Sequence, residues 1–454
     1  MAIAIKGVIV VLELNELKTL LQKAGVVGAG GATFPTYVKL APGADTLVIN
    51  AADCEPLLYT DLTLMERYMD KALSGIRTVM DAAGIPQALI GVKESKGKVL
   101  HWSQGQELAP GIKACLLPDV YPMGDEINLI YEATGRIVPP GKLPITVGVI
   151  VMNLETVYNV HLACHENRPV TEKWLTINGN VSPVVICVPL GVRVQDVFRR
   201  LGIKVPDNHI VIDGGPSMGR IIDLHTAIVT KATKGLLILP RTIPAVIAKE
   251  RPMRQQLTMA SSACCGCSRC TDLCPRNLLG YPLEPHKHVR VTANSEHIQP
   301  EAVLSASLCC ACGICEIAAC CQYISPRAVI AEHKGVLAQA KMRFTAQDDA
   351  KYVASPERAS RMMSSQRWMQ YLGVDRYTAH PECDPIKMNF DRVEIRLSQH
   401  IGAPSVAQVT VGNPVSVGQM IAAPAGGLSV AQHASIDGTV VAVDANRIVI
   451  EATH

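Results

Sequence analysis

The residues with the clearest capacity for chemistry are the cysteines of the segment 264–321. This segment holds 11 of the 16 cysteines of the chain. Its first run has the spacing C-x2-C-x2-C-x3-C-P, which bacterial ferredoxins use to hold a [4Fe–4S] cluster. The two-residue gaps let three sulfurs of one tight loop reach three irons, and the fourth sulfur comes from another part of the chain. The cysteines of this run are Cys264, Cys267, Cys270 and Cys274.

A second run repeats the pattern with one departure. Its cysteines are Cys309, Cys312 and Cys315. In two-cluster ferredoxins each run gives its last cysteine to the other cluster, so we expect Cys274 to complete the second cluster. The first cluster then needs Cys320 or Cys321, because four residues instead of three follow Cys315 before the next cysteine. We take Cys320 as the eighth ligand and keep Cys321 as the alternative.

Two other uses of these cysteines have to be weighed. Zinc also binds C-x2-C pairs, and isolated cysteines are often buried in cores or joined in disulfides. Consecutive C-x2-C steps in two runs, the first of which ends in C-P, favour iron–sulfur ligation over both. Cys265 and Cys310 lie between the ligand positions, and we expect them to be bystanders.

The overall composition limits the classes of partner and location. With 454 residues, 48% of them hydrophobic, the chain should form roughly two to four domains. A net charge of +3 and an aromatic content of 4% give no reason to expect a nucleic acid partner. We find no signal peptide and no run of about 18 apolar residues, so we expect a cytoplasmic protein without a transmembrane segment. Residues 1–12 are read as a first strand or as a packaging segment.

A glycine-rich segment near the N-terminus is a candidate for binding phosphate. Four of the seven residues 25–31 are glycine, and successive N–H groups of such a loop can form an anion-binding nest. Lys39 follows closely enough to reach a phosphate. A flexible turn is the alternative, since the segment does not match G-x-G-x-x-G. The candidate loop residues are Gly28, Gly30, Gly31, Ala32 and Thr33.

Polar residues follow a predicted buried strand at residues 46–50. They include Asn50, Asp53 and Glu55. Ligands of α/β proteins bind at the carboxyl ends of strands, so these side chains are candidates for holding a cofactor. A solvated turn is the alternative interpretation.

The hydrophobic periodicity predicts an α/β domain with a mostly parallel sheet, followed by smaller modules. Helices are expected at 13–24, 62–83 and 194–201, and strands at 46–50, 88–92, 147–151 and 184–188. The expected organisation is an α/β domain at 1–170, an α+β module at 171–234, a connector at 235–258, a two-cluster ferredoxin-like domain at 259–328, a polar helical segment at 329–387 and a β-rich sandwich or flattened barrel at 388–454.

Together these motifs resemble the FMN-binding subunit of respiratory NADH dehydrogenase and, more closely, the C subunit of the Rnf electron-transport complex. The resemblance rests on 28–36 with Lys39, on 50–56, on Tyr121 with 124–126, and on 153–156. It implies that the loop and Lys39 cradle the FMN phosphate. It also implies that Asn50, Asp53 and Asn153 hold the flavin, that Asp125, Glu126 or Glu55 helps to place NADH, and that 174–232 is a soluble-ligand-binding β-grasp domain.

The order of the segments suggests a narrower family. Residues 397–404 resemble a segment that lies at the N-terminus of the Rnf C subunit, yet here they are near the C-terminus. The rearranged order is similar to that of the corrin reductases of propanediol-utilisation microcompartments. This resemblance implies NADH as donor, FMN, two [4Fe–4S] clusters and reduction of cobalamin from Co(III) to Co(II) and Co(I). It further implies as partners cobalamin, free or carried by a corrin adenosyltransferase, and other proteins in the microcompartment lumen.

Two other functions stay open from the sequence. The chain could be an Rnf-type electron-transfer subunit of a membrane-associated complex without corrin specificity, or a non-catalytic assembly component with structural clusters. The intact flavin-loop pattern opposes the second, and the moved C-terminal segment opposes the first. We expect no side chain to act as general acid or base, because bound redox cofactors carry the electron chemistry.

Overall fold

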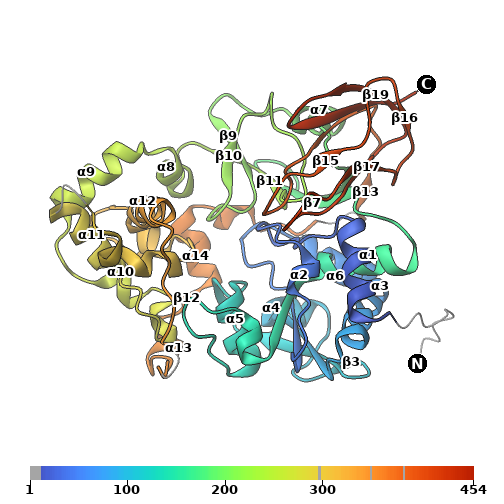
Figure 1. Cartoon of the computed structure of the whole chain (residues 1–454). Helices are drawn as coiled ribbons and strands as arrows, with labels where there is room; N and C mark the ends of the chain where they lie inside the picture. Colours follow the sequence, from blue (N-terminus) through green and yellow to red (C-terminus); the bar gives the residue numbers. More distant parts are fainter. Residues whose placement is uncertain (1–11, 295–297, 348–349, 382–383, 454) are drawn as a thin grey trace.

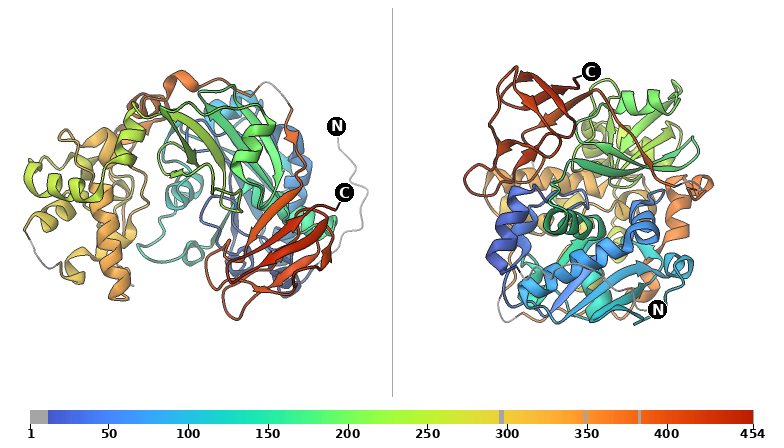
Figure 2. Two further views of the ribbon diagram at one scale, coloured as in Figure 1. Left: turned by 90° about the horizontal axis from the view of Figure 1, so that it is seen from above. Right: turned by 90° about the vertical axis from the view of Figure 1, so that its right-hand side faces the viewer.

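The protein consists of an α/β module, a β-grasp module, a cluster module and a C-terminal β module (Figure 1). This computed structural model describes residues 12–294, 298–347, 350–381 and 384–453. The cluster module projects to one side, as Figure 2 also shows, and it shares an apolar core with the α/β module. The α/β and C-terminal modules also share a core. Residues 1–11 lie outside the described residues, and with them nearly all of the predicted first strand or packaging segment.

The α/β module is built on a five-stranded sheet with the order β3-β4-β2-β1-β6. All neighbouring pairs except β3 and β4 are parallel, as the periodicity predicts. The strands are β1 (Thr46–Asn50), β2 (Gln87–Lys93), β3 (Glu107–Ala109), β4 (Ile112–Leu117) and β6 (Val149–Asn153). The carboxyl ends of β1 and β6 therefore meet at one edge, where Asn50 is the register partner of Asn153.

Helices cover both faces of this sheet because side chains of a strand alternate between the faces. Leu47 and Ile49 of β1 pack with one group of helices, and Val48 packs toward the other face. The first face carries α1 (Leu14–Lys23), α3 (Thr60–Ala83) and α6 (Leu154–His165), and the second carries α5 (Glu126–Thr134). Shorter elements of the module are α2 (Thr36–Lys39), α4 (Glu94–Val99), β5 (Val120–Tyr121) and η1 (Pro144–Val147).

The β-grasp module has a six-stranded sheet in the order β10-β9-β11-β7-β8-β13 with α7 (Val194–Arg200). Its strands are β7 (Glu172–Gly179), β8 (Val184–Pro189), β9 (His209–Asp213), β10 (Arg220–Ile222), β11 (Gly235–Pro240) and β13 (Ile386–Lys387). The sequence predicts a connector from residue 235 onward, but β11 lies between β9 and β7 in the sheet. Its buried apolar run is a strand because both neighbours bond to it, which periodicity alone does not reveal.

The cluster module is a set of short helices around a small apolar core of Ala260, Val289, Ile324 and Val329. Its elements are α9 (Met253–Ala263), α10 (Arg269–Asp272), η2 (Asn277–Leu279), α11 (Pro285–Asn294), η3 (Pro300–Leu308), η4 (Cys315–Ala319) and α12 (Pro326–Gln339). The helix α8 (Pro244–Glu250) leads into it from the β-grasp module. Other buried apolar residues of this module, among them Leu283, Val303 and Ile330, belong to a core that it shares with the α/β module.

The chain then returns from the cluster module to the α/β module. Along this return lie α13 (Arg358–Arg361), β12 (Met363–Ser364), α14 (Ser365–Leu372) and η5 (Asp375–Tyr377). β12 pairs with β5, so this predicted polar helical segment also contributes a short strand to the α/β module. Trp368 on α14 is fully buried at the junction.

The C-terminal module contains a four-stranded and a three-stranded sheet, with the orders β14-β20-β19-β16 and β15-β17-β18. Its strands are β14 (Arg392–Arg396), β15 (Val406–Ala407), β16 (Pro414–Val415), β17 (Met420–Ala423), β18 (Gln432–His433), β19 (Gly438–Val443) and β20 (Arg447–Glu451). Apolar residues of both sheets join the same core as α1 and α3. The module is therefore attached to the rest of the protein through a shared core.

Candidate functional site

The glycine-rich loop connects α1 with α2, and several backbone contacts hold it in place. An isolated β-bridge joins Val27 to Pro35, and the N–H of Gly28 donates to the carbonyl of Phe34 over 2.9 Å. The N–H of Ala29 donates to Thr156 Oγ1 over 3.0 Å. Between these anchors Gly31 has φ of +97°, and an added Cβ would meet no atom within 4 Å. The tip is thus a fixed, open cradle of backbone, which fits a phosphate-bearing cofactor.

Two asparagine side chains lie beside this cradle, at the carboxyl ends of β1 and β6. A Cβ on Gly30 would stand only 2.6 Å from Asn153 Oδ1, so a larger residue there would displace the Asn153 amide. Asn50 Nδ2 donates to the carbonyl of Gly124 over 2.9 Å. The residues that the sequence singled out in three separate segments therefore meet at one edge of the sheet, and their donors fit a flavin.

Lys39 ends α2 and lies on the same side of the sheet. Its Nζ atom is 2.7 Å from Glu126 Oε1 and 3.2 Å from the carbonyl of Val151. Both side chains of the ion pair keep about a third of their surface exposed, at 30% and 38%. Lys39 is therefore held near the cradle by a partner that leaves it open to solvent and to an anion.

Asp53 has partners within the protein. Its carboxylate accepts from the N–H groups of Asp61 and Leu62 at the start of α3, and Lys96 lies 2.9 Å away. Burial alone would raise the pKa of Asp53, but Lys96 and Lys234 outweigh it and hold the pKa below its usual value. The charged carboxylate therefore stabilises the helix start, and its predicted contact with a flavin stays a prediction.

The three acidic residues expected to place NADH are likewise engaged. Glu126 pairs with Lys39, and Asp125 pairs with Arg276 at 2.6 Å while it caps α5 through the N–H of Asn128. Glu55 accepts from the N–H groups of Ser217 and Met218 at 2.9 and 3.1 Å. Desolvation raises the pKa of Glu55, and those N–H donors only partly offset it. Their predicted role toward NADH stays a prediction.

Tyr121 connects this edge of the sheet with the cysteines. Its hydroxyl donates to the carbonyl of Cys312 over 2.8 Å and lies 3.2 Å from Glu55 Oε1. Its ring stacks on that of Trp368 with centroids 4.8 Å apart and planes 12° apart. Trp368 Nε1 in turn donates to Ser217 Oγ over 2.9 Å. Tyr121 thus joins the α/β, β-grasp and cluster modules.

The cysteines next to Tyr121 form the first of two groups of sulfur, which we name the inner set. It consists of Cys274, Cys309, Cys312 and Cys315, of which all but Cys309 are buried. Burial raises the pKa of Cys274 to about 12, and the neighbouring sulfurs of Cys309 and Cys310 act in the same direction. Four thiolates in so little space repel one another unless cations neutralise them, so this donor set fits a metal cluster.

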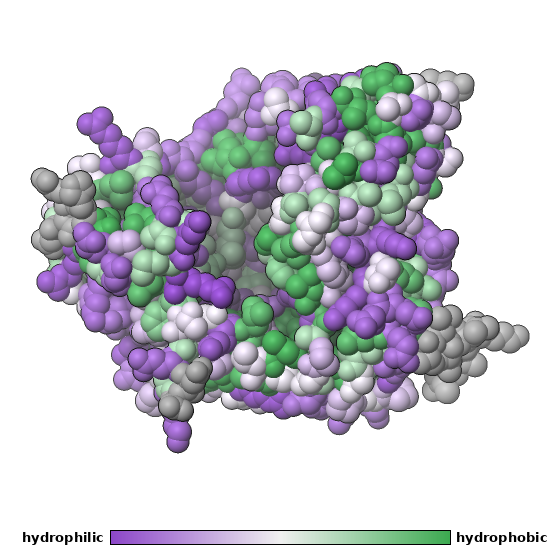
Figure 3. All heavy atoms as spheres, in the orientation of Figure 1, coloured by the Kyte–Doolittle hydropathy of each residue, from purple (hydrophilic) through white to green (hydrophobic). Residues whose placement is uncertain are grey.

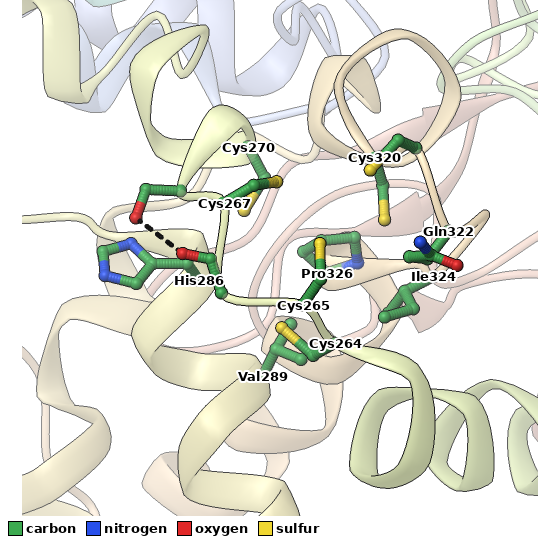
Figure 4. A pocket seen from close by; sticks show the side chains of 13 residues that line it. Cys264, Cys265, Cys267, Cys270, His286, Val289, Cys320, Gln322, Ile324 and Pro326 are labelled. Atoms are coloured by element: carbon green, nitrogen blue, oxygen red, sulfur yellow. Dashed lines mark hydrogen bonds between the residues drawn. The ribbon is translucent and has the colours of Figure 1, made fainter.

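The other four predicted ligands form the outer set, Cys264, Cys267, Cys270 and Cys320. Figure 4 shows these side chains around one pocket. Cys264 and Cys267 are exposed, whereas Cys270 and Cys320 are half-buried. Burial raises the pKa of Cys270 to about 12, and Cys320, Cys267 and Cys264 add to the shift because their sulfurs face it. Cys320 therefore faces the first run, as expected of the eighth ligand.

The irregular spacing after Cys315 has a local structural cause. Residues Cys315–Ala319 form a π-helical turn, with Cys320 directly after it in an extended conformation. A π turn accommodates one residue more than an α turn. The fourth intervening residue is thereby absorbed, and the Cys320 side chain still enters the outer pocket. Cys321 lines the same pocket, so the choice of Cys320 over Cys321 as the eighth ligand stays a prediction.

Curated relatives decide the family. A Salmonella typhimurium protein named cobalamin reductase PduS is 37% identical over 457 residues, covering 99% of each chain. Its namesake from Citrobacter freundii is 37% identical over 433 residues, or 94% of each chain. The chain belongs to the PduS family. The C subunit of a Na⁺-translocating ferredoxin:NAD⁺ oxidoreductase complex from Acetobacterium woodii is also similar, at 32% identity over 59% of each chain.

The domain families agree with this PduS membership. Residues 21–162 match the Nuo51 FMN-binding domain, residues 263–325 a 4Fe-4S dicluster domain, and residues 377–453 the RnfC barrel sandwich hybrid domain. The predicted flavin-binding and iron–sulfur domains and the C-terminal barrel-sandwich fold are thereby confirmed. Among the described residues no helix combines the length and apolar character needed to cross a membrane.

The PduS-type C-terminal module also touches the glycine-rich loop, which sequence reasoning did not foresee. The N–H of Ile401 donates to the carbonyl of Thr33 over 3.3 Å, and Tyr37 Oη donates to the carbonyl of Gly427 over 3.3 Å. From the β-grasp module, Lys231 Nζ donates to the carbonyl of Gly25 over 2.8 Å. The motif 397–404 thus lies against the loop, and its likeness to an Rnf segment was the available signal.

Proposed function

We propose that this protein oxidises NADH and reduces the cobalt of cobalamin, with FMN and two [4Fe–4S] clusters as resident cofactors. NADH gives up two electrons together, whereas cobalt and iron–sulfur clusters accept them singly, and a bound flavin supplies the conversion between the two. Full-length similarity to PduS supports this reaction over that of an Rnf subunit, which matches just 59% of the chain.

One observation carries the proposal: an unbroken series of contacts joins the flavin cradle to the cysteines. Asn50 beside the cradle bonds to Gly124, which follows Tyr121 by three residues. Tyr121 bonds to the main chain of Cys312 in the inner set. A rigid link of this kind fixes the spacing between two redox sites, which a flexible linker would not do.

Each part of the site has a defined role in this proposal. The N–H groups of Gly30 to Thr33 and the Lys39 ammonium would hold the phosphate, whereas the N–H groups of Gly28 and Ala29 anchor the loop. The amides of Asn50 and Asn153 would orient the flavin ring. The inner and outer sets would each hold one cluster. Figure 3 shows a deep hollow between the cluster module and the other modules, and the glycine-rich loop lies at its edge. This hollow offers NADH a route to the loop.

The partners and the location follow from the same assignment. We propose that cobalamin reaches the protein free or carried by a corrin adenosyltransferase, and that the protein works with other proteins in the lumen of a bacterial microcompartment. PduS in the name of the relatives supports this location. Co-purification of the tagged chain with intact microcompartments tests it, and recovery solely in the soluble fraction contradicts it.

The decisive experiment measures NADH-dependent reduction of aquacobalamin by the purified protein after anaerobic reconstitution with FMN, iron and sulfide. Appearance of the Co(II) absorbance, dependent on NADH and on FMN, is expected. Cobalt that stays oxidised while NADH reduces the bound flavin would favour the Rnf-type alternative. A protein that binds no flavin and has no diaphorase activity would be an assembly component instead.

A further inference from the structure

Three pairs of adjacent cysteines occur in the cluster module, and each contributes one sulfur to the inner or outer set. The pairs are Cys264 with Cys265, Cys309 with Cys310, and Cys320 with Cys321. If the two sets hold clusters as proposed, Cys265, Cys310 and Cys321 remain without a cluster. What these three thiols do is not explained by electron transfer.

The three remaining cysteines differ in their surroundings. Cys265 and Cys321 are exposed, and Cys310 is half-buried beside the inner set. The sulfurs of Cys265, Cys267 and Cys321 lie within 4.8 Å of one another. Cys267 is a ligand by its spacing, so Cys265 and Cys321 form a separate pair of thiols. They come from two loops that are distant in sequence and flank the same pocket.

We propose that Cys265 and Cys321 are a redox-active dithiol that closes into a disulfide over the outer set; this rests on the ligand assignment proposed above. A disulfide needs sulfurs about 2.05 Å apart. The Cys265 and Cys321 sulfurs start within 4.8 Å of each other, so closing the bond requires a small shift of these exposed residues. Solvent exposure also lets a small disulfide approach either cysteine, whose thiolate is the attacking group.

The oxidant that the reaction needs is a small disulfide such as oxidised glutathione. One cysteine thiolate attacks it, forms a mixed disulfide and releases one glutathione thiol. The second cysteine then attacks the mixed disulfide and releases the other thiol. One S–S bond breaks and one forms, and the protein pair loses two electrons and two protons to the two glutathione thiols. No electron from either cluster is required.

Closing this bond would tie together the loops that supply the outer ligands. Cys264 and Cys267 flank Cys265, and Cys320 precedes Cys321. The bond would add a covalent link to the apolar packing that already joins the elements carrying the two loops. With it, the four outer ligands stay close together, so the empty outer set refills more readily. The dithiol thus protects the more exposed of the two cluster sites under oxidising conditions.

The test uses full-length protein reconstituted anaerobically with FMN, iron and sulfide. Oxidised glutathione is added, free thiols are alkylated, and the digest is analysed by mass spectrometry alongside an iron assay. We expect a cross-linked peptide joining residues 265 and 321 with the iron content unchanged. Full iron content without that cross-link, or a cross-link from either residue to Cys267, would overturn the proposal.

Variants separate the dithiol from cluster ligation. Cys265→Ser and Cys321→Ser should each lose the cross-link and keep all the iron, and Cys310→Ser is the matched control that keeps both. Loss of half the iron in Cys321→Ser would make Cys321 a ligand and overturn the dithiol. Cobalamin reduction by the untreated protein is measured separately. If the cross-link forms but cobalamin is not reduced, the proposed function is overturned and the dithiol proposal is not.

Discussion

The inner and outer sets use nearly the same cysteine spacing in different surroundings. Cys274, Cys312 and Cys315 of the inner set are 7–8% exposed, and the side chains of Arg276 and Arg327 line their pocket. Arg276 pairs with Asp125 of the α/β module, and Arg327 pairs with Glu316 at 2.8 Å. In the outer set Cys264 and Cys267 are exposed, although residues of the cluster module line this pocket just as they line the inner one.

This difference indicates the direction of the proposed electron transfer, from the inner set to the outer set. The inner set is a structural junction, joined to the flavin-binding module through Tyr121 and to the β-grasp module through Arg327, which donates to the carbonyl of Ser217 over 2.9 Å. The outer set is accessible from solvent, as an outlet to a separate acceptor must be. Identical ligand spacing therefore does not imply an identical role, because the contacts around each set decide what it can exchange electrons with.

Gly31→Glu should have the largest effect, because it removes the inlet that both sets would share. The carboxylate adds bulk and negative charge to the open tip of the phosphate cradle. We expect purified protein without flavin, in which NADH reduces neither set while dithionite still reduces both. Gly43→Glu is the matched control, since Gly43 also has positive φ and open space around it. A yellow, NADH-reducible Gly31→Glu protein would contradict the loop assignment.

Cys315→Ser and Cys267→Ser compare the two sets directly. Each should abolish cobalamin reduction, because each removes a direct cluster ligand. Loss of a residue that merely hydrogen-bonds to a metal ligand already lowers metal affinity by about 10–100-fold. In Cys267→Ser the inner iron–sulfur signal should still appear on addition of NADH, as followed by electron paramagnetic resonance. In Cys315→Ser neither set should respond to NADH. Cys115→Ser, a buried cysteine outside both sets, should leave both signals intact. A reversed pattern would exchange the inner and outer roles.

The order in which the two sets release iron to a chelator should follow the solvent exposure of their cysteines. The outer set should lose its iron first, because a chelator reaches Cys264 and Cys267 from solvent. We expect two phases of equal size in the absorbance at constant pH, with cobalamin reduction lost in the first phase and flavin reduction by NADH kept. A single phase, or retention of cobalamin reduction after the first, would remove the distinction between the sets.

Tyr121→Phe should change the iron–sulfur signal of the inner set alone, and by less than the cysteine substitutions do. The ring keeps its stacking on Trp368, but the carbonyl of Cys312 loses its donor. An unsatisfied buried group costs about 1–3 kcal/mol, so the midpoint of thermal unfolding should fall. The control is Tyr281→Phe, which removes a bond to the carbonyl of Val138 and should lower stability without changing the inner signal. An altered outer signal in Tyr121→Phe would contradict the proposed junction.

Local patterns in the sequence predicted a good part of this arrangement. β1 at residues 46–50 matches its prediction, since a β-branched, apolar run between polar turns has few other solutions. The sulfur groups were also predictable, because the ligand spacing is a local property of two loops. The boundary at β11 was not, since its identity as a strand depends on partners at β9 and β7.

What the sequence could not supply are contacts between distant segments. The bond from Tyr121 to Cys312 spans 191 residues, and Trp368 reaches Ser217 across 151 residues. Asp53 was a reasonable candidate for the flavin by its place after a strand. Its carboxylate bonds to the start of α3 and to Lys96, contacts that become visible only in the folded turn, and its contact with a flavin stays a prediction. Candidate functional residues can thus be predicted from the sequence, whereas the residues that they contact in the fold cannot.

The smallest expected effect concerns Glu55, whose carboxylate contacts Tyr121 at the inner junction. Desolvation raises its folded pKa above the ordinary value of 4.5. Between 4.5 and that higher pKa the folded protein binds more protons than the unfolded chain, so this contribution to stability increases as pH falls through the window. Glu55→Gln should remove this pH dependence. The test compares the thermal unfolding midpoints of the variant and the parent protein from pH 4.5 up to neutral pH.

Asp53→Asn is the control of opposite sign. The lowered pKa of Asp53 means that its charged form stabilises the fold, so the variant loses stability at neutral pH. Parallel pH profiles for Glu55→Gln and the parent protein would mean that Glu55 is not destabilised by its surroundings, and that the inner junction is held by Tyr121 and the arginine pairs alone.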